Sequence, residues 1–269
     1  MSWRLSADVH EFDAVAGDFL REHPVDHTVL LTETAYLTAR PSAATDQLYG
    51  WFQPADGPVS AAFVQAPRHA PVLSLAPPAA IESLVDVLPD LTRIGVDGRL
   101  VVDVAAAWRD RTPLVERSRI RLYRLDEWRP RALPTGQARV ATLDDRDRLV
   151  DWFGQLMAAH PDDPSELAYV VDDPLSYGGI TLWEIDGVPV AMAGRSRLVA
   201  GMVRLGAVFA PDHADHGDAA FVAAIQAARG IADDVLVFAA SHDAAGDAHY
   251  RSLGFVPVLD RVMLGAGTD

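Results

Sequence analysis

The 269 residues are 49% hydrophobic and 23% charged, a balance typical of a globular chain that folds as one large domain or two ordinary ones. The chain has no cysteine, which excludes disulfides, thiolate metal sites and a cysteine nucleophile. It has neither an apolar run near the roughly 18 residues of a membrane span nor a signal-peptide pattern, so we expect a cytoplasmic protein without a membrane partner. The formal net charge of −15 argues against a nucleic-acid partner, because phosphate backbones are bound by clustered basic side chains. The negative charge either favours a cationic substrate such as an amine or serves solubility alone.

The N-terminal half alternates helical and strand patterns. Apolar residues at helical spacing predict the helices, and short apolar runs bounded by Gly and Pro predict the strands. In chain order the prediction is helices over residues 9–22 and 29–38, strands over 48–52, 59–65 and 72–75 with a turn at 54–58, a helix over 81–88, a strand near 94, a helix over 100–108 and a strand over 120–125.

The C-terminal half shows a similar order more clearly. Thr142 is expected to cap a helix that carries aspartates in its first turns and apolar residues up to Met157, and Asp186-Gly187 between alternating runs is typical of a hairpin. The remaining prediction is a helical segment over 164–171, strands over 179–185, 188–193 and 202–210, a helix over 219–228 ended by Gly230, a strand over 235–241, and a last helix and strand.

The two halves therefore read as two copies of one αβ unit. The segment 126–136 between them contains Pro130 and Pro134 and has the composition of a linker. We expect an N-terminal domain over residues 1–130 and a C-terminal domain over residues 131–269.

Two segments of the C-terminal half carry the residues with chemical potential. The first, Pro211-Asp-His-Ala-Asp-His-Gly-Asp-Ala-Ala-Phe221, joins a strand to a helix and contains three aspartates and no arginine. The second runs from Asp243 through His249-Tyr-Arg-Ser-Leu-Gly-Phe255, after the buried strand at 235–241.

These segments resemble the acyl-coenzyme A half of the GNAT superfamily of N-acetyltransferases, most clearly over residues 179–264. The resemblance implies an α/β (α+β) fold of two GNAT-like units, each with a mixed, mostly antiparallel central sheet flanked by helices. Over its whole length the chain looks like a tandem-GNAT protein, in which the N-terminal repeat lacks a coenzyme loop. The corresponding turn there, Leu75-Ala-Pro-Pro-Ala-Ala-Ile81, has two prolines, which remove backbone donors.

In the family, the pyrophosphate of the coenzyme binds a turn that reads Gln or Arg, two variable residues, Gly, one variable residue, then Gly or Ala. The matching positions here run from Ala214 to Ala219, so the small residues are present and the basic or amide residue is absent. A carboxylate about 4 Å from a phosphate costs on the order of 1–4 kcal/mol, and Asp215 and Asp218 would weaken binding if they faced it. The residues expected to bind acetyl-CoA as cosubstrate are Val208, Phe209, Ala210, Ala214, His216, Gly217, Asp218, Ala219, Asp243 and Asp247.

The resemblance also implies a catalytic acid. Tyr250 stands where the family has a tyrosine that protonates the departing thiolate, and a phenol is protonated at neutral pH; the alternative is that its ring only packs a helix face. For the base that accepts the amine proton, the best candidate is Glu184 on the first hairpin strand, or a water. A carboxylate on a strand more often lies on a solvated face.

The sequence thus predicts transfer of an acetyl or other acyl group from acyl-CoA to an amine of a small molecule or protein, without a metal, by a monomer or a homodimer. A second hypothesis is a catalytically silent GNAT fold that acts as a binding module or subunit, because its coenzyme turn is degenerate. A third treats the side chains of the 211–221 segment as metal ligands, although ligands strung along one loop are poor evidence for a site. Those side chains are Asp212, His213, Asp215, His216 and Asp218.

Overall fold

The computed structural model describes residues 2–54, 57–161, 163 and 165–267, and the chain forms two compact units. The first comprises Met1–Leu122, Ala239–Asp247 and Pro257–Asp269, and the second comprises Tyr123–Phe238 and Ala248–Val256. The middle of the turn expected at 54–58 and the start of the helical segment expected from Pro164 lie outside the described residues. Within the described residues, no helix is both long and apolar enough to span a membrane.

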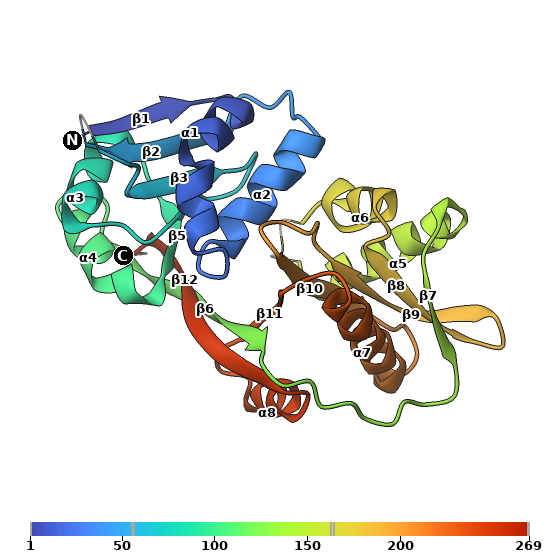
Figure 1. Ribbon diagram of the computed structural model, residues 1–269. Coiled ribbons are helices and arrows are strands. Elements are labelled where there is room, and N and C mark those ends of the chain that lie inside the picture. The colour runs from blue at the N-terminus through green and yellow to red at the C-terminus, as the bar shows by residue number, and fades with distance from the viewer. Residues whose placement is uncertain (1, 55–56, 162, 164, 268–269) are drawn as a thin grey trace. The chain divides into compact units, whose positions relative to one another are not determined.

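The first unit is a mixed sheet with helices on both faces (Figure 1). Its strands follow the order β1-β2-β3-β4-β5-β12, antiparallel except for β4 and β5, which pair in parallel. The elements are β1 (Ser2–Ser6), α1 (Val9–Glu22), α2 (Thr28–Ala39), β2 (Leu48–Gln53), β3 (Ala61–Gln65), β4 (Val72–Leu73), α3 (Pro78–Val87), β5 (Arg93–Asp97), η1 (Gly98–Leu100), α4 (Val101–Ala107), most of β6 (Leu114–Leu125) and most of β12 (Phe255–Ala266).

Alternation along β2 explains how both faces of this sheet are covered. Tyr49 stacks on Phe12 of α1, with ring centroids 5.4 Å apart. Phe52 points the other way, into a buried cluster with Leu84 of α3 and Val104 of α4. Because successive strand residues face opposite sides, one strand contributes to both cores.

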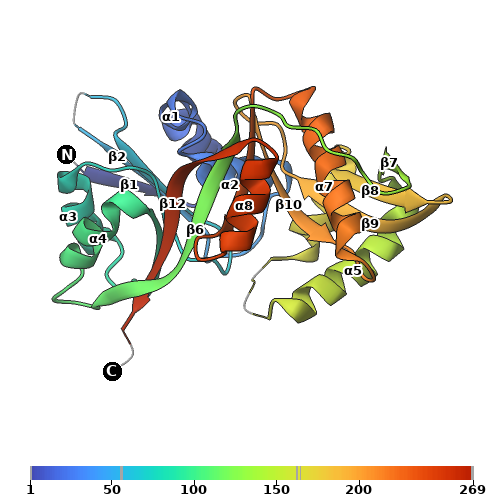
Figure 2. The same ribbon diagram turned by 90° about the horizontal axis from the view of Figure 1, so that it is seen from below.

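The second unit contains the strand order β11-β10-β9-β8-β7, in which only β10 and β11 pair in parallel. The apolar face of α5 packs Leu149 and Trp152 against Leu182 and Met192 of the sheet. Figure 2 shows α5 and α7 on opposite faces of β8, β9 and β10. The elements are β7 (Gln137–Val140), η2 (Leu143–Asp145), α5 (Arg146–Ala159), η3 (Ala168–Asp172), α6 (Asp173–Ser176), β8 (Ile180–Ile185), β9 (Val188–Arg195), β10 (Met202–Phe209), α7 (Ala214–Arg229), most of β11 (Asp234–Ala240) and the second half of α8 (Ala244–Ser252).

The predicted repeat is confirmed in the order of the elements. From β1 to β6 and again from β7 to β12, the chain runs strand, helix, helix, three strands, helix, strand, helix, strand. The predicted Asp186-Gly187 hairpin is also present, and both residues have positive φ, 50° and 78°, as a type I′ turn requires. The mixed, mostly antiparallel α/β architecture agrees with the fold class expected from the sequence.

Three details differ from the prediction. The edge strands β1 and β7 were not predicted, because their sequences, SWRLS and QARV, lack an apolar run and pair on one side only. The helix α6 lies beyond the predicted helical segment, which ends at residue 171, and its Pro174 stands in the first turn, where a missing N–H is tolerated. Helix α7 begins at Ala214, five residues before the predicted start at 219.

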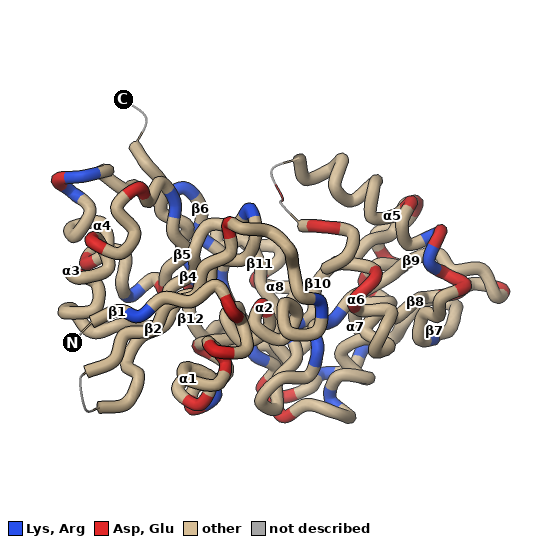
Figure 3. The backbone as a smooth tube through the Cα atoms, turned by 90° about the horizontal axis from the view of Figure 1, so that it is seen from above, with Lys and Arg blue, Asp and Glu red and all other residues tan. Residues whose placement is uncertain are grey.

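The division into units does not coincide with the contiguous halves 1–130 and 131–269. Residues 257–269 group with the first unit, because β12 pairs with β5 from Arg261↔Asp97 to Gly265↔Arg93. Backbone pairing, which sequence composition does not encode, decides this membership. Acidic and basic positions are interspersed along each unit (Figure 3).

Candidate functional site

The site begins where β10 leaves its parallel partner. The pairing of β10 with β11 runs from Met202↔Asp234 to Leu205↔Val237, and β10 continues to Phe209. Its register with β9 shifts between Gly206 and Phe209, and Ala207 within this bulge has φ 49°. Bulges re-aim backbone groups and occur frequently beside active sites, and a non-glycine residue at positive φ costs of order 1 kcal/mol or more. The end of β10 is therefore a distorted strand that continues beyond its pairing with β11.

Helix α7 follows directly, and its early start changes the expected coenzyme turn. All the positions from Ala214 to Ala219 lie inside the helix rather than in a loop before it. Gly217 is buried, and a Cβ there would lie 3.4 Å from side-chain atoms of both Val208 and Ala210. The small residue at 217 thus lets α7 pack closely on the end of β10.

The start of α7 offers the donors that an anion needs. A helix leaves its first N–H groups without partners inside the helix, and its dipole makes this end positive. These groups belong to Ala214 and Asp215, whereas His216 already donates to the carbonyl oxygen of His213 (3.0 Å). The carboxylate of Asp215 is exposed, and its charge favours this helix end.

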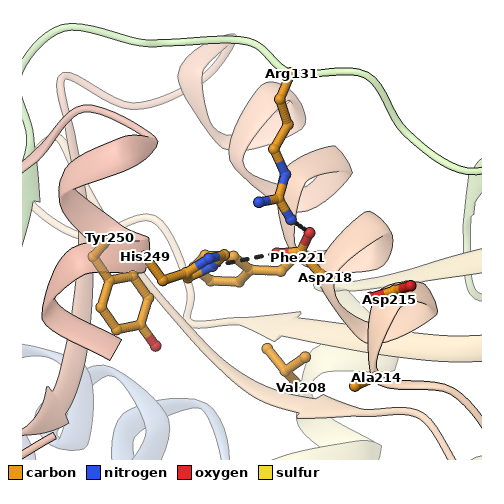
Figure 4. Close-up of a pocket in the computed structure, with 8 residues that line it drawn as sticks. All are labelled: Arg131, Val208, Ala214, Asp215, Asp218, Phe221, His249 and Tyr250. Atoms are coloured by element: carbon orange, nitrogen blue, oxygen red, sulfur yellow. Dashed lines mark ion pairs between the residues drawn. The ribbon is translucent and has the colours of Figure 1, made fainter. Parts of the chain in front are cut away.

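A pocket of about 450 Å³ lies between the start of α7, the end of β10 and the second half of α8 (Figure 4). It brings together four of the predicted residues, namely Val208, Ala214, Asp218 and Tyr250. Asp215, which the sequence analysis considered as a charge that would weaken binding, and three residues that it did not select complete the lining, namely Arg131, Phe221 and His249.

Asp218 is the ionic centre of this pocket. Its carboxylate pairs with the guanidinium of Arg131 and lies 3.2 Å from Nε2 of His249 (Figure 4). Burial lowers the pKa of His249, and the positive charge of Arg131 lowers it further. His249 is therefore neutral at neutral pH, and the negative charge of Asp218 is offset by Arg131.

Tyr250 is held by aromatic rings on several sides. Its ring centroid lies 5.5 Å from that of Tyr123, 5.9 Å from that of Phe221 and 6.0 Å from that of Phe255. The last two contacts are edge-to-face, which is a preferred geometry for aromatic pairs. The phenol is thus fixed in direction and remains half-buried at the pocket wall.

No protein-family model matches this sequence, and the curated proteins give no match either. Solved structures do share its fold. A GCN5-related N-acetyltransferase from Sphaerobacter thermophilus is 15% identical, with a TM-score of 0.59 over 99% of this chain and 97% of that one. A GNAT-family acetyltransferase from Colwellia psychrerythraea (10% identity, TM-score 0.59) and a tandem GNAT protein from the clavulanic acid biosynthesis pathway (11% identity, TM-score 0.56) each match over 100% of both chains. The chain has the GNAT fold, in a tandem arrangement.

The structure places Glu184 outside the lining of this pocket, and its role as a base stays a prediction. Glu184 is buried on β8, and its Oε1 accepts a hydrogen bond from Nε of Arg139 on β7 at 2.6 Å. The same guanidinium donates to both oxygens of Asp145, at 2.6 and 2.7 Å. Glu184 therefore belongs to an ion-pair network that joins β7, β8 and the start of α5, and not to the pocket.

Other predicted residues have local structural contacts. Phe209 packs on Trp152 of α5, with centroids 6.2 Å apart, and Ala219 is buried within α7. The carboxylate of Asp243 accepts from the backbone N–H groups of Ala245 and Gly246 and so caps α8. Asp247 lies in the first turn of that helix.

The metal hypothesis gains no geometric support. The rings of His213 and His216 meet edge to face, with centroids 5.2 Å apart. Within the described residues, no group of three His, Asp or Glu side chains is placed to hold a metal ion.

Arg131, Phe221 and His249 are the residues that sequence reasoning missed. Phe221 and His249 stand within the two segments that resemble the GNAT motifs, so a search of those segments for pocket-facing positions would have included them. Arg131 lies in the predicted linker, and nothing in its local sequence distinguishes it from Arg129, two residues earlier.

Proposed function

We propose that this protein is an acyl-CoA-dependent N-acyltransferase whose reaction takes place in the second GNAT unit. The observation that carries the proposal is the juxtaposition of the bulged end of β10, the start of α7 and Tyr250 around one pocket. In a chain with the GNAT fold, this is the combination that a thioester substrate requires.

The residues present fit coenzyme A. The backbone N–H groups of Ala214 and Asp215 and the guanidinium of Arg131 suit phosphate oxygens. The exposed side chain of Val208 and the ring of Phe221 suit the pantetheine arm, which can also pair with the backbone at the end of β10. When bound, the coenzyme supplies an acyl group activated as a thioester.

The reaction we propose is direct attack by a neutral amine. The amine nitrogen forms a bond to the acyl carbon, the carbon–sulfur bond breaks, and the sulfur receives a proton from the hydroxyl of Tyr250. The extra proton on the new amide nitrogen leaves to water, since Glu184 is engaged by Arg139, and the phenolate of Tyr250 takes a proton from water, which restores the phenol. Backbone dipoles at the bulge stabilise the charge that develops on the acyl oxygen.

The first test is a thermal melt with acetyl-CoA. A ligand that prefers the native state at one hundred times its Kd adds about 2.7 kcal/mol, or on the order of 5 °C for a domain of this size. No shift at millimolar coenzyme would reject the transferase and leave the second hypothesis, a silent binding module.

The second test separates binding from chemistry. Tyr250→Phe should bind acetyl-CoA as the wild type does but lose about 10²-fold in rate with an amine panel. Tyr177→Phe is the matched control, because Tyr177 lies outside the pocket lining and its hydroxyl donates a hydrogen bond to the carbonyl oxygen of Arg195 at 2.8 Å. Loss of this hydrogen bond should lower stability and leave the rate per folded molecule unchanged. Equal rates for Tyr250→Phe and wild type would refute the acid role.

A further inference from the structure

The segment that the sequence presents as a linker is anchored beside the pocket. The N–H groups of Asp126 and Glu127 donate to the carbonyl oxygen of Gly254, at 3.0 and 3.4 Å, and Arg129 N–H donates to that of Leu253 at 3.1 Å. Gly254 has φ 97°, and a Cβ there would overlap the carbonyl oxygen of Glu127. Glycine is therefore required for this close approach, and it fixes the backbone two residues before Arg131.

A second anchor holds the same segment against α7. The guanidinium of Arg229, the last residue of α7, lies 5.6 Å from the centroid of the Trp128 ring. Three residues further on, Arg131 reaches Asp218 near the other end of the helix. Figure 4 shows the Arg131 side chain extending from this segment to the carboxylate of Asp218. Its position is thus set by the fold of the second unit and not by a freely moving linker.

The charges of the pocket single out this arginine. Of the eight residues that line it, two are aspartates, His249 is neutral at neutral pH, and Arg131 carries the permanent positive charge. Ala214, where the GNAT motif has a basic or amide side chain, lines the same pocket. Arg131 therefore gives this pocket, from a different part of the chain, a positive charge that Ala214 does not provide.

Resting on the proposed function, we propose that Arg131 is the phosphate-binding residue of the coenzyme pocket and that Asp218 is the internal anion that competes for it. A guanidinium binds a phosphate through two parallel hydrogen bonds, which is a stronger arrangement than a neutral donor provides. When the guanidinium turns to phosphate, Asp218 keeps His249 as a neighbour, at 3.2 Å.

The test measures coenzyme A binding by calorimetry, without turnover. Arg131→Ala should weaken binding at least tenfold, since one unit charge at about 4 Å is worth 1–4 kcal/mol and 1.4 kcal/mol is a factor of ten. Asp218→Asn should tighten it several-fold. Arg129→Ala is the matched control, because Arg129 is 61% exposed, lies on the same segment and pairs only loosely with Glu127 (3.9 Å), so it should leave the Kd unchanged.

Salt provides an independent readout. The affinity of the wild type for coenzyme A should fall as NaCl rises, and Arg131→Ala should show a weaker dependence. Arg131 is 37% exposed, so its replacement leaves no large buried cavity, and a melt of each variant without ligand checks that the fold is intact.

The outcomes separate the two proposals. If the wild type does not bind coenzyme A, both fail. If the wild type binds and Arg131→Ala binds equally well, the role of Arg131 is refuted while the proposed function stands. If Arg131→Ala weakens binding but Asp218→Asn does not tighten it, Asp218 is no competitor.

Discussion

Replacement of Glu184 by glutamine tests whether this carboxylate is structural or catalytic. Its side chain is only 7% exposed and its Oε1 lies 2.6 Å from Nε of Arg139, which is 35% exposed. At an effective dielectric constant near 20, charges about 4 Å apart interact by about 4 kcal/mol. Glutamine keeps an oxygen that accepts from Arg139, and Asp145 still neutralises the guanidinium. We therefore expect a net loss of about 2 kcal/mol in the free energy of unfolding, below the 3–5 kcal/mol typical of a fully buried pair.

This loss corresponds to a melting temperature lower by about 4–8 °C for a domain of this size. Glu116→Gln is the control, because Glu116 pairs with Arg119 at the same 2.6 Å on an exposed strand, where ion pairs contribute at most about 1 kcal/mol. Urea unfolding and acyl transfer per folded molecule are the assays. Unchanged stability with a large loss of rate in Glu184→Gln would refute the structural assignment and restore Glu184 as the base.

Two further predictions concern protonation. Hydrogen bonds from Arg139 hold the pKa of Asp145 at about 2, below its ordinary value of 3.8. The ionised carboxylate therefore stabilises the fold by about 2 kcal/mol above pH 4, and this contribution disappears as the pH falls to about 2. The difference in unfolding free energy between wild type and Asp145→Asn should shrink over that window, and a difference independent of pH would contradict this. Burial lowers the pKa of His249, and the positive charge of Arg131 lowers it further. In Arg131→Ala the pKa of His249, followed by NMR titration of the imidazole, should therefore rise. An unchanged value would show that the two groups do not interact.

Much of the fold followed from local sequence signals. Asp186-Gly187 predicts its hairpin because only a few residue types adopt the positive φ values of that turn. The apolar spacing of Leu149 and Trp152 predicts the face that α5 buries. Such signals depend only on residues close together in the sequence, so they can be recognised without the tertiary structure.

The candidate site was only partly predictable. Val208, Ala214 and Tyr250, which the resemblance to GNAT motifs selects, line one pocket, and their roles stay predictions. Gly217, a small residue of the expected coenzyme turn, packs α7 on the end of β10. Glu184 could not be excluded as a base from sequence, because its partner Arg139 lies 45 residues away on an edge strand that carries no clear strand pattern.

By itself the sequence determined the repeated order of helices and strands and the position of the tyrosine in the last helix. Only the tertiary structure decided which charges meet. Arg131 and Asp218 are far apart in the chain, and the contact between them depends on Gly254 and Trp128 holding an irregular segment against α7 and α8. Electrostatic interactions act through space over a few ångströms and produce no periodic pattern in a sequence, so only the folded chain shows that Arg131 and Ala214 line the same pocket.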